Sequence, residues 1–286
     1  MTIREVLKIS IEKLKENKIE EPILKAKMLV SHVLDKEKEY LIINEDKLLS
    51  NEQIKRINKG IDNLLKGIPI QYITNTQEFM GLDFYVDENV LIPQPDTEIL
   101  VEEVLEILKK INNPKILDLC TGSGAIAISI AKKYVELGFV SAHHIIASDI
   151  CCKALNVAKI NCKKQKEDIE LIESDLFKNI KEKFNIIISN PPYIETNVIK
   201  TLIQEVQYEP KLALDGGFDG LDFYRRIINE AHSFLEPNGY LCLEIGYNQK
   251  DNVINLIKQS KEYCNIYYKR DLAGNDRIVI CQKNNI

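Results

Sequence analysis

The sequence lacks any apolar run that approaches the length of a membrane span, although 45% of its 286 residues are hydrophobic. Residues 1–5 lead into alternating charge and do not open the apolar core of a secretory signal. We therefore expect a cytoplasmic protein that does not enter a membrane.

A Cys-x-x-Cys pair is also missing, and the seven cysteines are an odd number. Structural zinc sites and disulfide frameworks use cysteines paired at characteristic spacings. The cysteine pattern therefore argues against both, and we expect no bound metal.

The sequence also has no excess of basic residues. It contains 38 Lys and Arg and 43 Asp and Glu, which gives a formal net charge of −5. Proteins that grip long nucleic acids normally carry a basic surface, since neutralising phosphates supplies much of the affinity. The charge balance weighs against direct nucleic-acid binding.

The length suits one sizeable α/β domain with a smaller appendage. Residues 1–70 carry apolar positions at helical spacing, with helix starts near Pro22 and Ser50. This periodicity fits equally a bundle that only packs on the main domain and a docking module for a macromolecular substrate.

Residues 71–95 predict a linking β-hairpin that turns at Gly81, with Tyr72–Ile73 already strand-like. Residues 96–286 form the main domain.

From Lys115 onward, short apolar runs alternate with helical segments. Strands are predicted at 116–120, 145–148, 169–172, 184–189, 240–245, 263–268 and 277–281. Repeated βαβ units predict a parallel sheet that is covered by helices on both faces.

The sequence Asn190-Pro191-Pro192-Tyr193 directly follows the predicted strand 184–189. Neither proline has an N–H, so the main chain after Asn190 offers carbonyl acceptors without competing donors. The Asn190 side chain adds an acceptor and Tyr193 adds an aromatic face. Such a loop suits a planar –NH2 group, although a turn that merely ends a strand would use the same residues.

The glycine-containing segment 118–124, Asp-Leu-Cys-Thr-Gly-Ser-Gly, follows the first strand of the main domain. Gly122 and Gly124 allow the backbone to approach a ligand closely, and the following helix offers amide donors. The same spacing, with Ala127, also fits a dinucleotide-binding fingerprint, and the glycines could serve packing alone.

Two carboxylates follow the next two strands. Asp149 is placed to accept hydrogen bonds from ribose hydroxyls, or to cap the helix after it. Asp175 could accept from an adenine amino group while Leu176 or Phe177 covers the ring, or could simply form a turn. Together with the glycine loop, they predict a nucleoside cofactor opposite an amino-group clamp.

This combination resembles the class I S-adenosylmethionine-dependent methyltransferases, and other segments resemble the HemK-type release factor glutamine methyltransferases. These segments extend over essentially the whole chain: 67–73 (GIPIQYI), 79–84 (FMGLDF), 91–98 (LIPQPDTE), 209–210 (EP), 212–224 (LALDGGFDGLDFY), 243–246 (LEIG) and 271–277 (DLAGNDR). The resemblance implies a Rossmann-like, mostly parallel seven-stranded sheet with a small N-terminal helical domain that docks the substrate.

The implied reaction moves a methyl group from S-adenosyl-L-methionine to the side-chain amide nitrogen of the glutamine in the Gly-Gly-Gln motif of class 1 peptide chain release factors, leaving S-adenosyl-L-homocysteine. The enzyme is expected to be a monomer. Our hypothesis assigns catalysis to Asn190, Pro191 and Tyr193, with Pro192 completing the substrate site. The cofactor-binding residues are expected to be Cys120, Thr121, Gly122, Ser123, Gly124, Asp149, Asp175, Leu176 and Asn190.

Three positions depart from the family pattern. Gln94 stands where an arginine is usual, and Asp96 stands where a glutamate is usual. Cys120 replaces a common glycine, and we interpret it as the buried apolar end of a strand. The acidic, glycine-rich segment 215–222 is either a lid over the glutamine or a strand-to-helix turn.

Two other functions compete with this one. An adenine-N6 DNA or RNA methyltransferase would clamp the same kind of amino group on a flipped base. A nucleoside-binding protein without catalysis, or a dinucleotide oxidoreductase, would share the glycine loop. The amino-group clamp, however, has no purpose in hydride transfer.

Overall fold

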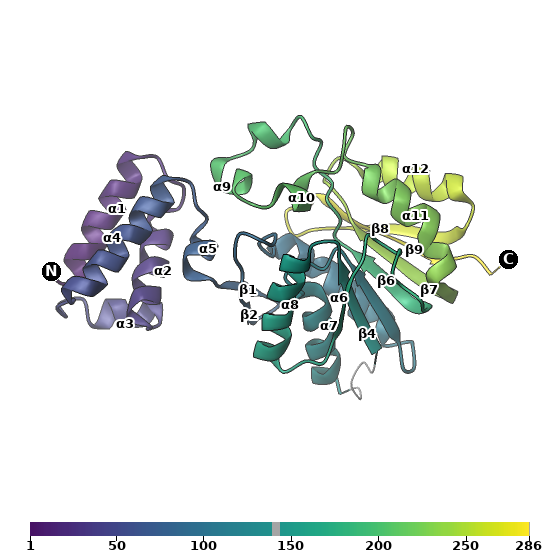
Figure 1. Cartoon of the computed structure of the whole chain (residues 1–286), viewed down its shortest axis with the longest axis horizontal. Helices are drawn as coiled ribbons and strands as arrows, with labels where there is room; N and C mark the ends of the chain where they lie inside the picture. Colours follow the sequence, from purple (N-terminus) through teal and green to yellow (C-terminus); the bar gives the residue numbers. More distant parts are fainter. Residues whose placement is uncertain (139–143, 286) are drawn as a thin grey trace. The chain divides into compact units, whose positions relative to one another are not determined.

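A computed structural model describes residues 1–138 and 144–285. The chain divides into two compact units (Figure 1). Unit 1 comprises Met1–Thr76 and Ile203–Tyr208, and unit 2 comprises Gln77–Leu202 and Glu209–Ile286. No helix in the described ranges combines the length and hydropathy needed to cross a bilayer.

Unit 1 is helical, as expected. It contains α1 (Ile3–Glu16), α2 (Pro22–Leu34), α3 (Lys38–Ile43), α4 (Asn51–Leu65), α5 (Ile70–Thr74) and α9 (Gln204–Gln207). Capping boxes at Thr2 and Ser50 start α1 and α4, and Pro22 opens α2. The predicted starts at Pro22 and Ser50 are confirmed.

The strand predicted at Tyr72–Ile73 is wrong, because both residues lie in α5. Ile70 is buried in the core of unit 1 and Ile73 packs against the same core. That spacing of three residues requires a helix, so packing overrides the strand preference of the β-branched residues.

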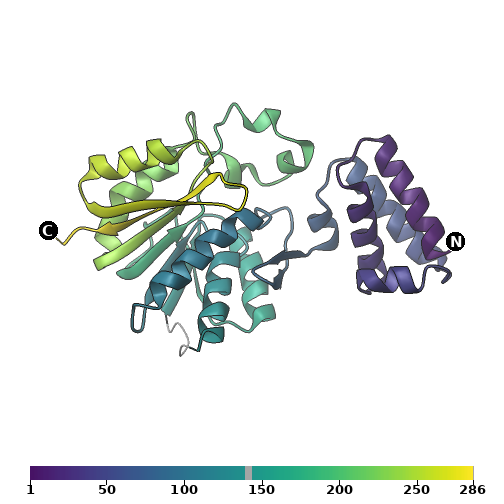
Figure 2. The same ribbon diagram turned by 180° about the vertical axis from the view of Figure 1, so that it is seen from behind.

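Unit 2 begins with the predicted hairpin, β1 (Gln77–Phe79) and β2 (Leu82–Phe84), which turns at Met80 and Gly81. The main sheet contains β3 (Lys115–Leu119), β4 (His144–Asp149), β5 (Glu170–Glu173), β6 (Phe184–Ser189), β7 (Leu235–Glu244), β8 (Tyr263–Arg270) and β9 (Asp276–Lys283). Its order is β5-β4-β3-β6-β7-β9-β8. Strands β3 to β7 run parallel, while β9 is antiparallel to β7 and β8. Figure 2 shows β8 and β9 in yellow at one edge. The predicted mostly parallel seven-stranded sheet is confirmed.

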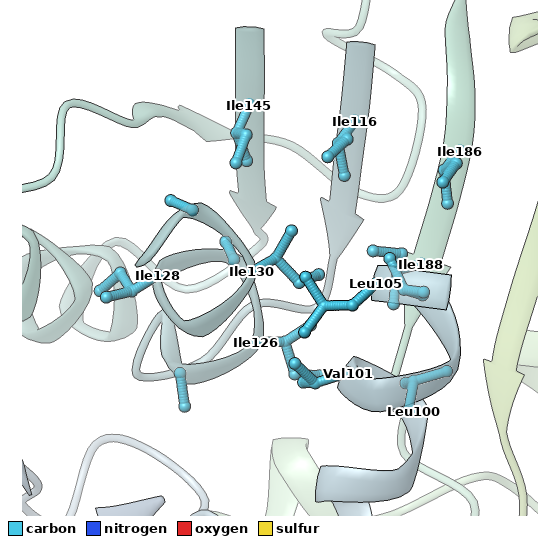
Figure 3. Packing of buried hydrophobic residues seen from close by; sticks show 14 of the residues in the cluster. Leu100, Val101, Leu105, Ile116, Ile126, Ile128, Ile130, Ile145, Ile186 and Ile188 are labelled. Atoms are coloured by element: carbon cyan, nitrogen blue, oxygen red, sulfur yellow. The ribbon is translucent and has the colours of Figure 1, made fainter. Parts of the chain in front are cut away.

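Helices cover both faces of this sheet. On one face, α6 (Glu98–Leu108), α7 (Ala125–Glu136) and α8 (Cys152–Gln165) pack with Ile116 and Ile186, and Figure 3 shows these isoleucines directed toward α6 and α7. On the other face, α11 (Asp222–Phe234) and α12 (Lys250–Ser260) pack with Leu117 and Ile187. Alternate strand residues thus serve two cores, which explains the continuous apolar runs in the sequence.

Short helical turns complete unit 2: η1 (Pro95–Thr97), η2 (Ile199–Thr201) and α10 (Lys211–Leu214). The chain proceeds outward from β3 through β4 to β5 and then returns to β6 on the other side of β3. This reversal between β3 and β6 creates the crevice at the carboxyl ends of the strands where open α/β sheets bind ligands.

Candidate active site

A cavity of about 280 Å³ lies in unit 2 at the carboxyl ends of four neighbouring strands. Cys120 and Gly122 after β3, Asp149 after β4, Leu176 after β5 and Asn190 after β6 all contribute to its wall. The predicted residues Asp175 and Pro192 also line it, whereas Thr121, Ser123, Gly124, Pro191 and Tyr193 lie outside the wall. Further wall residues that the sequence did not single out include Val90, Leu91, Ser148, Ile150, Cys151, Ala154, Ser174, Ala213, Phe223 and Arg226.

The glycine loop is shaped by its two glycines. Gly122 has a φ of +55°, and a Cβ added there would meet nothing within 4 Å. Gly124, with a φ of +80°, begins α7, and a Cβ there would lie 3.2 Å from Cβ of Ala158 on α8. Gly122 therefore leaves space on the cavity side, while Gly124 permits close packing between helices.

Behind the loop, Asp118 is completely buried and accepts a hydrogen bond from the Thr121 hydroxyl at 2.6 Å. Burial raises the pKa of Asp118 to about 7, and the bond from Thr121 opposes this rise. Thr121 is thus a support for the loop, because its side chain turns toward the sheet.

Cys120 corrects one expectation. The strand ends at Leu119, and Cys120 is half-buried on the cavity wall with a left-handed φ of +59°. A residue with a Cβ is strained in this conformation, which glycine adopts freely. The cysteine is therefore a tolerated substitute at a turn and not an apolar strand end.

Asp149 joins the ends of two strands. Its Oδ2 accepts from the Gly122 N–H and its Oδ1 from the Cys151 N–H, both at 2.9 Å. Burial raises the pKa of Asp149, and these two hydrogen bonds oppose the rise. The carboxylate thereby holds the glycine loop and the start of α8 while it also faces the cavity.

Asp175 has a partner that the sequence did not reveal. Arg226 on α11 donates from Nη2 to Asp175 Oδ1 at 2.6 Å, and both residues line the cavity. The adjacent Leu176 is buried, with a left-handed φ of +50° that turns the chain at this point. One carboxylate oxygen of Asp175 therefore remains for a ligand, beside an apolar surface.

The Asn190–Tyr193 segment is anchored at both ends. Asn190 Nδ2 donates to the Thr97 hydroxyl at 3.3 Å, and the Tyr193 hydroxyl donates to Glu244 Oε1 at 3.3 Å. Pro191 and Pro192 between them are buried. Burial, chiefly, raises the pKa of the Tyr193 hydroxyl well above its usual value. Thr97 and Glu244 had no recognisable signal in the sequence beyond lying in segments that resemble the family.

Glu244 ends β7 with only 2% of its surface exposed. Burial raises its pKa to about 7, while the Thr97 hydroxyl, the charge of Arg277 and the Tyr193 hydroxyl lower it. Arg277 is held by Asp271, with Nη2 at 2.8 Å from Oδ2.

The same guanidinium explains one departure from the family pattern. Arg277 Nη2 also donates to Asp96 Oδ2 at 3.0 Å, so the shorter carboxylate still reaches a cation. Gln94 turns away from this pair, because its Nε2 donates to the Ile92 carbonyl at 3.0 Å. The Ile92 N–H in turn donates to the buried Glu209 carboxylate at 2.9 Å. This bond connects the segments 88–91 and 210–213, which both contribute to the cavity wall.

The 215–222 segment is hydrogen-bonded to the residue that follows the Asn190–Tyr193 segment. Ile194 N–H donates to the Leu214 carbonyl at 2.9 Å, and Gly216 N–H donates to the Ile194 carbonyl at 2.8 Å. A Cβ at Gly216 would lie 2.7 Å from the Tyr193 Cα. The first half of the segment is therefore packed backbone to backbone, which supports the interpretation as a turn and not as a swinging lid.

These residues fit a nucleoside ligand with a polar tail. Open space beside Gly122 admits a ligand close to the backbone, and the buried Ser148 hydroxyl on the cavity wall has no hydrogen-bond partner among the described residues. Ile150, Ala154 and Leu176 supply apolar surface for a flat ring. The volume is close to the lower end for small-molecule pockets.

Two family models match the chain. The one described as PrmC N-terminal domain matches residues 5–74, and the one described as methyltransferase small domain matches residues 95–217. A protein of Clostridium acetobutylicum named release factor glutamine methyltransferase is 39% identical over 100% of both chains. A protein of the same name from Buchnera aphidicola is 41% identical over 99% of this chain and 100% of its own.

A solved structure adds evidence on the fold alone. The 16S rRNA N2 G1207 methyltransferase RsmC of T. thermophilus, in complex with AdoMet and guanosine, matches with a TM-score of 0.50. It is 15% identical, and the match covers 73% of this chain and 50% of that one.

Proposed function

Because this chain belongs to the release factor glutamine methyltransferase family, we propose that its strand-end cavity holds the methyl donor and that Asn190 presents the glutamine to it. The protein is an S-adenosyl-L-methionine-dependent methyltransferase that modifies the side-chain amide nitrogen of a glutamine in a release factor. The relatives do not favour the alternative of adenine-N6 methylation, nor that of nucleoside binding without catalysis.

The proposed cofactor site uses Cys120 and Gly122 on the cavity wall, with Thr121, Ser123 and Gly124 shaping the loop behind them, and the carboxylates that follow β4 and β5. Asp149 would accept from the ribose hydroxyls, and the free oxygen of Asp175 would accept from the adenine amino group, with Leu176 against the ring. When bound, S-adenosyl-L-methionine supplies an electrophilic methyl group. The support for this assignment is that these strand ends meet in one cavity.

The glutamine nitrogen is a poor nucleophile because its lone pair is conjugated with the carbonyl group. We propose that Asn190 Oδ1 and the Pro191 carbonyl accept hydrogen bonds from its two N–H groups, orient it, and stabilise the positive charge that develops on it. The nitrogen becomes acidic as it gains the methyl group and releases one proton to solvent. Pro192 keeps the loop rigid, and Tyr193 packs beside the amide plane. The observation that carries this role is the hydrogen bond from Asn190 Nδ2 to Thr97, which leaves Oδ1 unused by that partner.

Mass spectrometry tests the function directly. Incubation with S-adenosyl-L-methionine and a class 1 release factor should add one methyl group to the glutamine of the Gly-Gly-Gln motif, and DNA should remain unmodified. Asn190→Ala should slow single-turnover methylation by a factor that corresponds to about 2–4 kcal/mol. A wild-type rate in this variant would refute the role of Asn190.

Unit 1 is the proposed docking module. It contains a cavity of about 490 Å³ whose lining is apolar and basic apart from Glu12 and Glu45, in a chain whose overall charge is negative. The apolar lining residues are Leu7, Ile11, Ile23, Leu41 and Ile42, and the basic ones are Lys8, Lys15, Lys27 and Arg4, which pairs with Glu45. This surface suits an acidic, amphipathic segment of the release factor.

Charge reversal tests the docking role. The double variant Lys8→Glu/Lys15→Glu should raise KM for the intact release factor and leave methylation of a short Gly-Gly-Gln peptide unchanged. Lys55→Glu/Lys59→Glu, on exposed positions of α4 outside the cavity, is the matched control. Equal KM values in both variants would contradict the assignment.

The protein is further proposed to act as a cytoplasmic monomer that does not bind nucleic acid directly. The formal charge of −5 supports the last point. Light scattering and a filter-binding assay with tRNA and duplex DNA test the oligomeric state and the nucleic-acid binding.

A further inference from the structure

Gln249 is a buried polar residue beside the Asn190–Tyr193 segment, and none of the roles proposed above uses it. It follows β7 and lies directly before α12, with only 6% of its surface exposed. Burial of a carboxamide is unfavourable unless its N–H donors and its oxygen find partners. The partners of Gln249 therefore indicate what this side chain does.

The carboxamide connects three separate segments of the main chain. Its Nε2 donates to the Tyr193 carbonyl at 2.9 Å and to the Gly220 carbonyl at 3.2 Å. Its Oε1 accepts from the Gly246 N–H at 3.0 Å. One side chain thus joins the end of the Asn190–Tyr193 segment, the 215–222 segment and the chain that follows β7.

These partners allow only one orientation of the Gln249 carboxamide. A main-chain carbonyl can only accept a hydrogen bond, and a main-chain N–H can only donate one. Rotation of the carboxamide by half a turn would place Oε1 against two carbonyls and Nε2 against an N–H. Because no partner is a hydroxyl or a titrating group, the direction of all three hydrogen bonds is fixed.

Two glycines allow the three segments to approach this closely. A Cβ added at Gly220 would lie 2.4 Å from the Tyr193 carbonyl oxygen and 2.6 Å from Gln249 Nε2. A Cβ added at Gly246 would lie 2.8 Å from Gln249 Oε1. The carboxamide therefore fills a space that is bounded by main chain and that any side chain at these two positions would occupy.

The position of the Tyr193 main chain bears on the reaction. Pro191 and Pro192 fix their own φ angles, so a shift at the end of the segment is passed on to the residues before it. The start of the segment is held by β6, whose last residue is Ser189. Displacement of the Tyr193 carbonyl would therefore move the Pro191 carbonyl and the Tyr193 ring, which are proposed to contact the glutamine.

We propose that Gln249 is a positioning residue for methyl transfer, which holds the Tyr193 main chain and thereby aligns the acceptor groups with the glutamine nitrogen. This inference rests on the function proposed above for the Asn190–Tyr193 segment. Neither Gln249 nor its three partners line the strand-end cavity. Loss of the carboxamide should therefore lower the rate of transfer and leave the affinity for S-adenosyl-L-methionine unchanged.

Gln249→Met tests the proposal, because methionine has nearly the same length and offers no N–H donor. With saturating S-adenosyl-L-methionine and release factor, kcat should fall about 10- to 100-fold, as expected when a reacting group is misplaced by about 1 Å. KM for the release factor and the calorimetric Kd for the cofactor should stay at wild-type values. An unchanged Kd also shows that unit 2 of the variant is folded.

Gln249→Asn is the second variant. It keeps a carboxamide in the same place and withdraws it by one methylene group, so that it no longer reaches the Tyr193 and Gly220 carbonyls. It should lower kcat in the same way as Gln249→Met, again with an unchanged Kd.

Tyr263→Phe is the matched control for a general loss of stability. The Tyr263 hydroxyl is also buried and donates to a main-chain carbonyl of unit 2, that of Ile228, at 2.8 Å. Tyr263 pairs with Lys283, at the edge of the sheet where the parallel strands begin, opposite the cavity. This variant should unfold at a lower urea concentration than wild type and keep the wild-type kcat.

The proposal is overturned if either Gln249 variant keeps the wild-type kcat, if cofactor affinity falls together with kcat, or if Tyr263→Phe loses kcat by the same factor. Failure of the proposed function gives a different result. In that case the wild type would leave the release factor unmethylated, or Asn190→Ala would keep the full rate.

Discussion

The buried carboxyl of Glu244 makes a measurable prediction about stability. Its pKa rises from 4.5 in the unfolded chain to about 7 in the folded protein, chiefly because burial disfavours the charged form. Below about pH 4.5 the carboxyl is protonated in both the folded and the unfolded state, and the neutral group contributes its full stabilisation to the free energy of unfolding. As the pH rises through about 7, the buried group must ionise and that stabilisation is lost.

The magnitude follows from the difference between the two pKa values, at 1.36 kcal/mol for each pKa unit. Wild type should lose ~3 kcal/mol of unfolding free energy from this group between pH 4.5 and pH 8. Glu244→Gln has nearly the same shape and does not titrate, so it should lack this part of the pH dependence. Other titrating groups, such as Asp118, cancel in the comparison of the two proteins.

Urea unfolding at a series of pH values measures the effect. Circular dichroism is the suitable probe because the chain has no tryptophan. As the pH rises, wild type should lose unfolding free energy relative to Glu244→Gln, so the variant becomes the more stable of the two by comparison. Glu230→Gln, at an exposed position of α11, should follow wild type. A difference between wild type and Glu244→Gln that is constant from pH 4.5 to pH 8 would refute the reasoning.

Three further predictions concern the cavity and the loops around it. Gly216→Ala should slow methyl transfer at least about tenfold, because the added Cβ would lie 2.7 Å from the Tyr193 Cα. A wild-type rate in Gly216→Ala would show that this packing is not needed. Asp149→Asn should weaken cofactor binding in calorimetry by roughly 10- to 100-fold, since the amide cannot supply both acceptors that Asp149 uses for backbone N–H groups; an unchanged Kd would contradict this. Cys120→Val should be less stable to urea than Cys120→Gly by about 1–2 kcal/mol, because a β-branched residue is strained at a φ of +59°. Equal midpoints for the two variants would rule out backbone strain at this turn.

Local patterns were sufficient for most of the fold of unit 2. Apolar runs such as 184–189 and the helical periods between them depend on residues close in the chain, so their spacing predicts the strands directly. Parallel connection then brings the ends of β3 to β6 to one edge, and residues that follow strands, such as Asp149 and Asn190, meet there. Tyr72–Ile73 failed because its short β-branched pattern was compatible with a strand, and only burial in the core of unit 1 made it a helix.

Local sequence patterns could not predict the hydrogen bonds that orient the side chains of the site. Thr97 meets Asn190 across 93 positions of sequence, and Glu244 meets Tyr193 across 51. Arg226, likewise, reaches Asp175 from a different helix. Side chains with several possible partners obtain one only when the sheet and its helices have closed around them. The order of residues therefore specified which chemical groups arrive at the sheet edge, whereas folding selected which of them pair and which remain free to act, because pairing depends on distances that exist only in the packed molecule.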